Sequence, residues 1–261
     1  RRDVHLRLGN TIEASTGVAS EEVAPLLSLH FYRANDFERA WRYSAAAADN
    51  ARGAYANREA ITLYVRALEV AGRLRDVSSY DVGGVAESLA DVYELDAQYD
   101  LAFTACQRSR KSSGAQAEAR LMRKIGRIRQ RQVQYTQSLR WFGRGIQQVG
   151  AIEDRLRRAD EEAELSPGFA GTLHRQGRNI EAAMWAERAR VSAVATGDQA
   201  VLAAAFNMLD VVSRALDRPD AGYTDAALEL FRAVGDLVGE ANVLNNIGVR
   251  AYFAGDWELA A

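Results

Sequence analysis

The chain has 261 residues, of which 48% are hydrophobic and 26% charged, a balance typical of a folded protein. Its 33 basic and 35 acidic residues leave a formal net charge of −2, which excludes a protein that is basic throughout. The single cysteine, Cys106, excludes an internal disulfide framework and a zinc site built from cysteines.

The sequence contains no apolar run of the length that spans a membrane. Its N-terminal segment also lacks the apolar core of a signal peptide, so we expect no membrane association and a cytoplasmic location. Only Lys111 and Lys124 are lysines, and all other basic residues are arginine, a bias typical of a high-GC genome.

Abundant alanine and only three prolines favour helix along the whole chain. One motif recurs: an apolar helix, a short turn with Gly, Asn or Asp, then, in the clear copies, an aromatic residue followed three residues later by a small one. Copies lie at residues 35–40, 98–102, 134–138, 177–182, 218–221 and 255–260. Their small residues, the last five about 40 residues apart, are Ala40, Ala102, Ser138, Ala182, Ala221 and Ala260.

Local signals place further helices. The longer interval between Ala40 and Ala102 predicts one more helix pair or an extra helix, and residues 55–68 resemble the second helix of a unit. Gly197-Asp198 and Gly235-Asp236 each predict the end of one helix followed by the N-cap of the next. Pro167 fits a helix start or a kink within a longer helix.

The recurring residues resemble the tetratricopeptide repeat, a helix–turn–helix unit with small and aromatic residues at fixed places. Its first-helix pattern is matched by Leu89, Ala90 and Tyr93, and again by Ile125 and Gly126. The resemblance implies an all-α fold, a solenoid of about six helical pairs wound as a right-handed superhelix. The missing closing Pro and the longer spacing predict irregular stacking.

Residues 1–261 are expected to form a single solenoid of this kind. Its approximate units are 21–54, 55–82 (irregular), 83–118, 119–162, 163–200, 201–240 and a truncated 241–261. Because natural arrays end in capping units and the last unit stops at Ala261, we expect the chain to be a fragment of a longer protein.

Residues 4–14, 26–74 and 241–261 are similar to the C-terminal repeat regions of large multidomain regulators from high-GC bacteria. That group carries an N-terminal class III adenylate/guanylate cyclase or a DNA-binding domain, then an ATPase domain, then the repeats. The resemblance implies a regulatory segment whose catalytic domains, a phosphorus–oxygen lyase of the cyclase type among them, lie elsewhere.

The sequence offers no catalytic constellation. Neither lysine follows a glycine, so a phosphate-binding loop is absent, and no histidine spacing suits a metal. His30 and Cys106 fit structural packing, and the four tryptophans mostly fall at helix-packing positions. We therefore predict no catalytic residue, no metal and no cofactor.

Charge is distributed unevenly. Residues 108–144 hold eleven basic residues against one acid, Glu118, which gives +10 and leaves −12 for the rest of the chain. Five of them share one helical stripe, opposite an apolar stripe of Leu121, Ile125 and Ile128. The stripe consists of Arg120, Arg123, Lys124, Arg127 and Arg131.

Three interpretations of this basic stripe remain open. In the first, the stripe is a solvated helix face or is neutralised by acidic neighbours within the fold. In the second, the stripe binds an acidic peptide, a carboxyl terminus or another domain of the same polypeptide. The third, nucleic acid, is disfavoured because the chain is acidic outside the stripe.

By the resemblance, the basic stripe lines the concave groove of the repeats. In the same register, other polar residues are predicted to face the groove: His174, Asn207, Asp210, Asn245, Asn246 and Tyr252. Asparagine side chains there can hold an extended peptide backbone by paired hydrogen bonds, although ordinary repeat packing also explains them.

We predict a non-catalytic protein–protein interaction and regulatory module of a multidomain signalling protein, a nucleotide cyclase with an ATPase domain. Its partner would be a protein or peptide, acidic in character, or another domain of the same polypeptide. The alternative is a repeat domain that senses a small-molecule inducer for an ATPase-type transcriptional regulator. A fragment with cyclase activity of its own is not expected.

Overall fold

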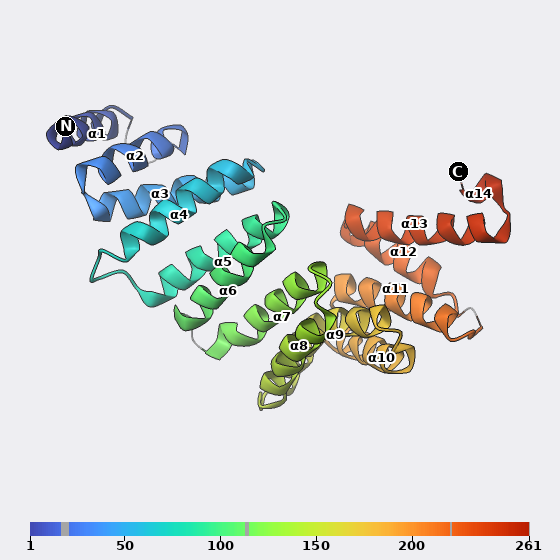
Figure 1. Cartoon of the computed structure of the whole chain (residues 1–261). Helices are drawn as coiled ribbons and strands as arrows, with labels where there is room; N and C mark the ends of the chain where they lie inside the picture. Colours follow the sequence, from blue (N-terminus) through green and yellow to red (C-terminus); the bar gives the residue numbers. More distant parts are fainter. Residues whose placement is uncertain (17–20, 113–114, 220, 261) are drawn as a thin grey trace. The chain divides into compact units, whose positions relative to one another are not determined.

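The computed structural model describes residues 1–16, 21–112, 115–219 and 221–260, and the regular structure of these residues is helical. The chain divides into two compact units, Arg1–Leu121 and Met122–Ala261, with the boundary inside one helix. Each unit is a stack in which consecutive helices pack against each other (Figure 1).

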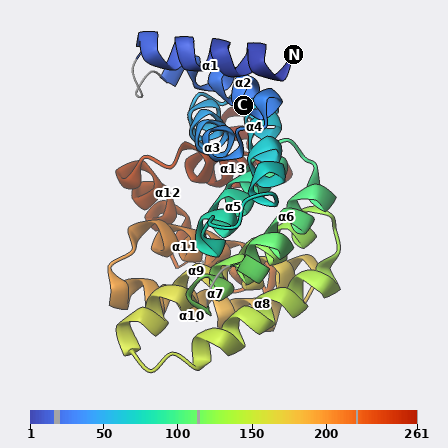
Figure 2. The ribbon, with the colours of Figure 1, turned by 90° about the vertical axis from the view of Figure 1, so that its left-hand side faces the viewer.

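The first unit begins with α1 (Arg2–Thr16), which packs on α2 at the N-terminal end of this unit (Figure 2). Its further elements are a short 3-10 turn (Glu21–Val23), α2 (Ala24–Ala34), α3 (Phe37–Gly53), α4 (Asn57–Ala71), α5 (Ser79–Leu95), α6 (Tyr99–Ser112) and the first part of α7 (Ala115–Arg131).

The second unit continues from α7 with pairs of antiparallel helices. Its elements are α8 (Tyr135–Gly150), α9 (Arg155–Arg175), α10 (Asn179–Thr196), α11 (Gln199–Ala215), α12 (Tyr223–Val234), α13 (Leu237–Ala254) and α14 (Trp257–Ala260). In the described part of the chain, α2 to α14 supply six helix–turn–helix pairs, and α1 and α4 stand outside them.

The long interval after Ala40 holds a single extra helix, α4, which packs between α3 and α5. Of the two alternatives that the spacing allowed, the extra helix is therefore correct. Pro167 lies inside α9. Of the two alternatives for this proline, a helix start or a position within a longer helix, the second is therefore correct.

Short turns with a left-handed residue separate many of the helices. Gly197 and Gly235 adopt positive φ at the ends of α10 and α12, where a side chain would be strained. Asp198 and Asp236 then cap α11 and α13 by accepting hydrogen bonds from backbone N–H groups of the first turn. Both predicted stop-and-cap signals are confirmed.

Small residues lie where the paired helices cross. Ala40, Ala102, Ser138 and Ala182 are completely buried, as the motif predicts. The weakest copy was wrong: Ala221 is exposed in the loop before α12, and Ala227 is the buried small residue. Asp220 of that copy lies outside the described residues, as does the side chain of Ala260.

Phe142 shows what the close packing requires. Its ring is buried between α7 and α9, where Gly126 and Gly168 face it. A Cβ atom on Gly168 would lie 2.6 Å from the ring, and one on Gly126 would lie 2.9 Å from it. The two glycines therefore form the slot that this aromatic side chain fills.

We expect Gly168→Ala to lower the free energy of unfolding by about 1–3 kcal/mol, because Phe142 has to leave its rotamer or the helices have to separate. Gly143→Ala, on α8 beside Phe142, is the matched control, since a Cβ there meets nothing within 4 Å. The control should be neutral or stabilising by up to about 1 kcal/mol through helix propensity. If urea unfolding showed that both variants lose the same free energy of unfolding, the role of the two glycines as a slot for Phe142 would be contradicted.

In the first unit, Glu13 ties α1 to α3. Its carboxylate accepts hydrogen bonds from Tyr43 (2.6 Å), Arg39 (2.9 Å) and Arg42 (3.0 Å). Burial raises the pKa of Glu13, but the hydrogen bonds from Tyr43 and Arg39 outweigh this effect, and the net pKa is lowered from 4.5. The ionised carboxylate therefore stabilises the folded state.

Because the pKa of Glu13 is lower in the folded than in the unfolded chain, its contribution is present above pH 4.5 and lost as the pH falls through the folded-state value. We expect Glu13→Gln to cost about 1–2 kcal/mol of unfolding free energy at pH 7 and progressively less in acid. Glu59→Gln, at an exposed carboxylate of α4, should show neither effect. A constant difference between Glu13→Gln and the wild type across the acid range would contradict this role.

Candidate peptide-binding face

The first helices of successive pairs form one surface of the second unit, here called the first-helix face. It is made by the last part of α7 together with α9, α11 and α13. Gln130 Nε2 on α7 donates to Thr172 Oγ1 on α9 at 3.0 Å, and α11 packs against both α9 and α13. Asn246 on α13 reaches Asn207 on α11 at 3.3 Å.

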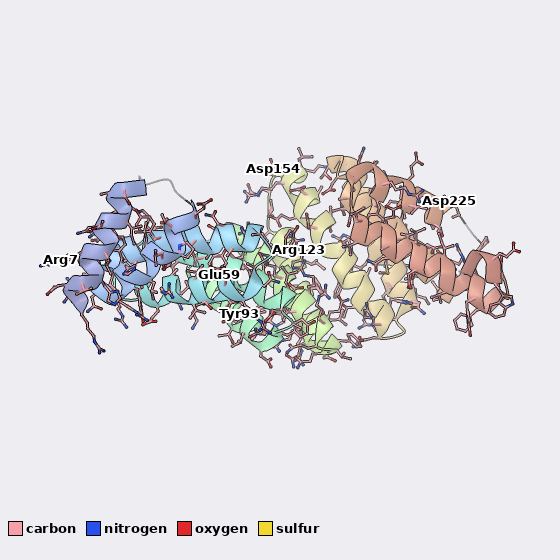
Figure 3. All side chains as sticks on the ribbon, turned by 90° about the horizontal axis from the view of Figure 1, so that it is seen from above. Arg7, Glu59, Tyr93, Arg123, Asp154 and Asp225 are labelled. Atoms are coloured by element: carbon pink, nitrogen blue, oxygen red, sulfur yellow. The ribbon has the colours of Figure 1, made fainter. Side chains whose placement is uncertain are left out.

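Two members of the basic stripe are paired with carboxylates of the fold. In the first unit, Arg120 donates two hydrogen bonds to Glu87 on α5, at 2.9 and 2.7 Å. In the second unit, Arg123, which is labelled in Figure 3, forms an ion pair with Glu164 on α9. For these two arginines, the positive charge is offset by acidic neighbours within the fold, which is one of the interpretations of the basic stripe given above.

The other stripe residues continue along α7. Arg127 and Arg131 are exposed, whereas Lys124 is half-buried. Arg123, Lys124, Arg127 and Arg131, at i, i+1, i+4 and i+8, lie on one side of the α7 segment of the second unit, with Glu164 against the first of them.

The remaining predicted groove residues fall into two groups. The structure brings Asn207 and Asn246 together across α11 and α13, and it leaves Asn245 and Tyr252 exposed on α13. Asp210, in contrast, is buried and paired with Arg214 one turn along α11, at 2.5 Å.

His174 ends α9 next to the turn into α10. Its Nδ1 lies 2.8 Å from Oδ1 of Asn179, the first residue of α10, so this histidine fastens the turn of its own hairpin. Tyr252 makes edge contacts with the rings of Phe253 and Trp257. Trp257 is exposed, so it departs from the packing role expected of the tryptophans, while Cys106 is buried as expected.

Sequence reasoning missed the contact between Gln130 and Thr172. Thr172 is completely buried and also lies 3.2 Å from Ser138 Oγ on α8, which joins three helices by side-chain hydroxyl and amide groups. The signal was the polar side chain of Gln130 next to the basic stripe, but its partner is 42 residues away and could not be identified by spacing.

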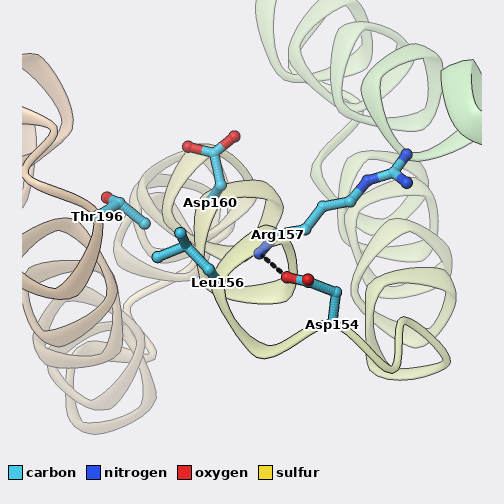
Figure 4. A pocket seen from close by; sticks show the side chains of 5 residues that line it. All are labelled: Asp154, Leu156, Arg157, Asp160 and Thr196. Carbon is cyan, nitrogen blue, oxygen red and sulfur yellow. Dashed lines mark hydrogen bonds between the residues drawn. The ribbon is translucent and has the colours of Figure 1, made fainter.

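A pocket of about 480 Å³ opens beside the start of α9 (Figure 4). Asp154 caps this helix by accepting the backbone N–H of Arg157 at 2.8 Å, and Leu156, Asp160 and Thr196 complete the lining. Asp154 and Asp160 both line this pocket, and Oδ1 of Asp154 is used by the helix cap.

Among the described residues, no group of three or more His, Cys, Asp or Glu side chains is placed to hold a metal ion. No helix in the described ranges is both long enough and apolar enough to cross a membrane.

Neither a protein-family model nor a curated protein matches the sequence. Solved structures of similar fold do match. The apo form of RapI has a TM-score of 0.66 and 10% identity over 99% of this chain and 93% of its own. Aspartyl phosphate phosphatase F from Bacillus subtilis has a TM-score of 0.64 and 12% identity, over 96% and 70%.

A Rap protein complexed with Competence and Sporulation Factor has a TM-score of 0.61 and 13% identity, over 92% of this chain and 67% of its own. At these identities the likeness shows the fold alone. It confirms the predicted class, an all-α, tetratricopeptide-like solenoid of helix–turn–helix units.

Proposed function

We propose that the chain is a non-catalytic interaction module that binds an extended protein segment on its first-helix face. The observation that carries this proposal is the run of hydrogen-bonding side chains across α11 and α13. Asn207 and Asn246 meet there, and Asn245 lies next to them in an exposed position.

Carboxamide side chains suit a peptide backbone because each offers a donor and an acceptor to an N–H and a C=O group. The distance of 3.3 Å between Asn246 and Asn207 is at the weak end for a hydrogen bond. Exchanging this contact for one with a peptide therefore costs little, and the exposed Tyr252 adds an aromatic surface for an adjacent side chain.

The basic part of α7 favours a partner with carboxylates. Because Glu164 contacts Arg123, and Lys124, Arg127 and Arg131 also have interactions within the chain, an incoming carboxylate competes with groups of the fold. We therefore expect a modest affinity for an acidic segment, and this affinity should decrease as the salt concentration rises. The asparagines as well as the charges should determine which segments bind. A free acidic protein or another domain of the same polypeptide would meet these requirements.

A protein of similar fold, the Rap protein compared above, was solved as a complex with Competence and Sporulation Factor. We place the chain, by its resemblance to high-GC bacterial regulators, in a cytoplasmic multidomain signalling protein with a nucleotide cyclase and an ATPase domain. Binding would change the activity of such a parent if the partner prefers one of its two states.

Fluorescence polarisation with three labelled peptides of equal length, rich in Glu, Ser or Lys, tests this proposal. The Glu-rich peptide should bind best, and Arg127→Glu should weaken it by about tenfold or more. Arg140→Glu makes the same charge change at an exposed position of α8 and should leave the affinity near the wild-type value.

Circular dichroism melts should show that both variants fold. Equal loss of affinity in the two variants would mean that net charge, and not this face, determines binding. Failure of the Glu-rich peptide to bind better than the other two would overturn the acidic-partner assignment.

A further inference from the structure

Two histidines meet where α1 lies on α2 at the end of the first unit (Figure 2). Nδ1 of His5 on α1 is 3.0 Å from Nδ1 of His30 on α2, and the centroids of the two rings are 5.1 Å apart. Both side chains are half-buried. The third histidine of the chain, His174, fastens a turn in the second unit and takes no part in this contact.

The contact between the two Nδ1 atoms is compatible with only some protonation states. When both rings are neutral, one Nδ1 donates a hydrogen bond and the other accepts it. One added proton preserves this arrangement, because the accepting Nδ1 still has its lone pair. A second added proton makes both nitrogens donors and places two positive charges against each other, so the contact becomes repulsive.

The surroundings of the pair oppose protonation further. Burial of His30 lowers its pKa below 6.5, and the charges of His5 and Arg33 lower this pKa as well. Arg33 is exposed one turn along α2, and Arg2 of α1 donates to the carbonyl oxygen of Ala34 at 2.7 Å. The pair therefore lies in a basic part of the surface.

Among the described residues, no carboxylate forms an ion pair with either histidine. On α1, Asp3 and Arg7 each lie two positions from His5, on the opposite side of the helix, and Arg1 precedes the helix. Glu22 of the 3-10 turn is exposed at the other end of α2. The charges of α1 and of the turn therefore do not neutralise a second proton on the pair.

The charged residues of α3 and α4 that approach α2 are engaged elsewhere. Glu13 and Asp36 both pair with Arg39 of α3. Arg66 and Glu69 of α4 contact α2 at the positions two before and two after its histidine, and so on the opposite side of that helix. Neither α3 nor α4 supplies a carboxylate to the pair.

Few other contacts hold α1 in place. Within residues 2–15, Gly9 is buried against the ring of Phe31, whereas every other side chain is exposed or half-buried. Elements with so few buried contacts open locally at low cost. A helix of 15 residues that leaves its neighbour is also only marginally stable. The contacts at the two ends of α1, the histidine pair and Glu13, therefore decide whether it stays docked.

We propose that His5 and His30 form a pH-sensitive latch, which opens in mildly acidic solution and releases the first half of α1 from α2 while the Glu13 end stays attached. Opening uncovers the side of α2 that carries His30 and the neighbouring Phe31. The chain thus contains a helix whose docking at the end of the first unit responds to pH.

The two ends of α1 respond in different pH ranges. The pKa of His30 is lower in the folded chain than the 6.5 of an unfolded histidine, so its contribution is present above pH 6.5 and is lost as the pH falls to the folded-state value. The pKa of Glu13 is lowered from 4.5, so its contribution persists down to that pH. In the interval between the two, the histidine end is released and the Glu13 end is not.

Hydrogen exchange of the 261-residue chain at about pH 7.5 and about pH 5.5, corrected for the intrinsic pH dependence of exchange, tests the latch. The amides of residues 6–9 should open about three- to tenfold more often in acid, since one pH unit between the two pKa values of His30 changes the opening equilibrium by up to about tenfold. The amides of residues 12–15 should change little.

Substitution of each histidine separates the latch from a general effect of acid. His30→Gln should abolish the acid response of residues 6–9. His5→Gln should reduce it, because only burial and Arg33 then lower the pKa of His30. His174→Gln, the matched control in the second unit, should respond like the wild type. Exchange at about pH 7.5 shows whether α1 is docked in each variant.

The imidazole signals of His30 in nuclear magnetic resonance give a second readout. In the wild type they should titrate below pH 6.5, and in docked His5→Gln they should titrate closer to 6.5, because the charge of His5 is gone. A contact in which His5 only fills space would not move the titration in this direction.

Equal protection of residues 6–9 at both pH values in the wild type would overturn the latch. An acid response that survives His30→Gln, or His30 signals that titrate alike with and without His5, would overturn it as well. Loss of the response in His174→Gln would show that it reports a change of the whole chain and not of the pair. The latch lies in the first unit, so peptide binding on the first-helix face of the second unit does not decide this test.

Discussion

Close approach of paired helices is the constraint on which the rest of this structure depends. Ala40, Ala102, Ser138 and Ala182 are completely buried at the crossings, where a larger side chain would separate the helices. Glycines have the same effect around Phe142, which fills the space that Gly126 and Gly168 leave. Because the helices are held this close, side chains from neighbouring first helices come within hydrogen-bonding distance.

The properties of the first-helix face follow from that spacing. Gln130 contacts Thr172 and Arg123 contacts Glu164, both between α7 and α9, and Asn207 contacts Asn246 between α11 and α13. Charge is partly compensated inside the fold, while the carboxamides retain donors and acceptors for a ligand. A face of this kind distinguishes between ligands by hydrogen-bond geometry as well as by charge.

The sequence allowed the helix pairs and their turns to be predicted, because small residues, aromatics and Gly-Asp steps are local signals. Ala221 was assigned wrongly because the loop between α11 and α12 is longer than the turns inside the other helix pairs, so the buried position falls at Ala227. The partners of Arg120 and Arg123 lie 33 and 41 residues away and could not be inferred from spacing within one helix. Periodicity also cannot show that apolar side chains such as Met184 and Val191 on α10 stay exposed.

Nuclear magnetic resonance of the side-chain amides tests the central claim, that the first-helix face binds an extended protein segment. During titration with the Glu-rich peptide, the account predicts that the signals of Asn207, Asn245 and Asn246 shift together, while Gln147, exposed on the outer side of α8, does not shift. Saturable shifts confined to other residues, with these three asparagines unchanged, would contradict it.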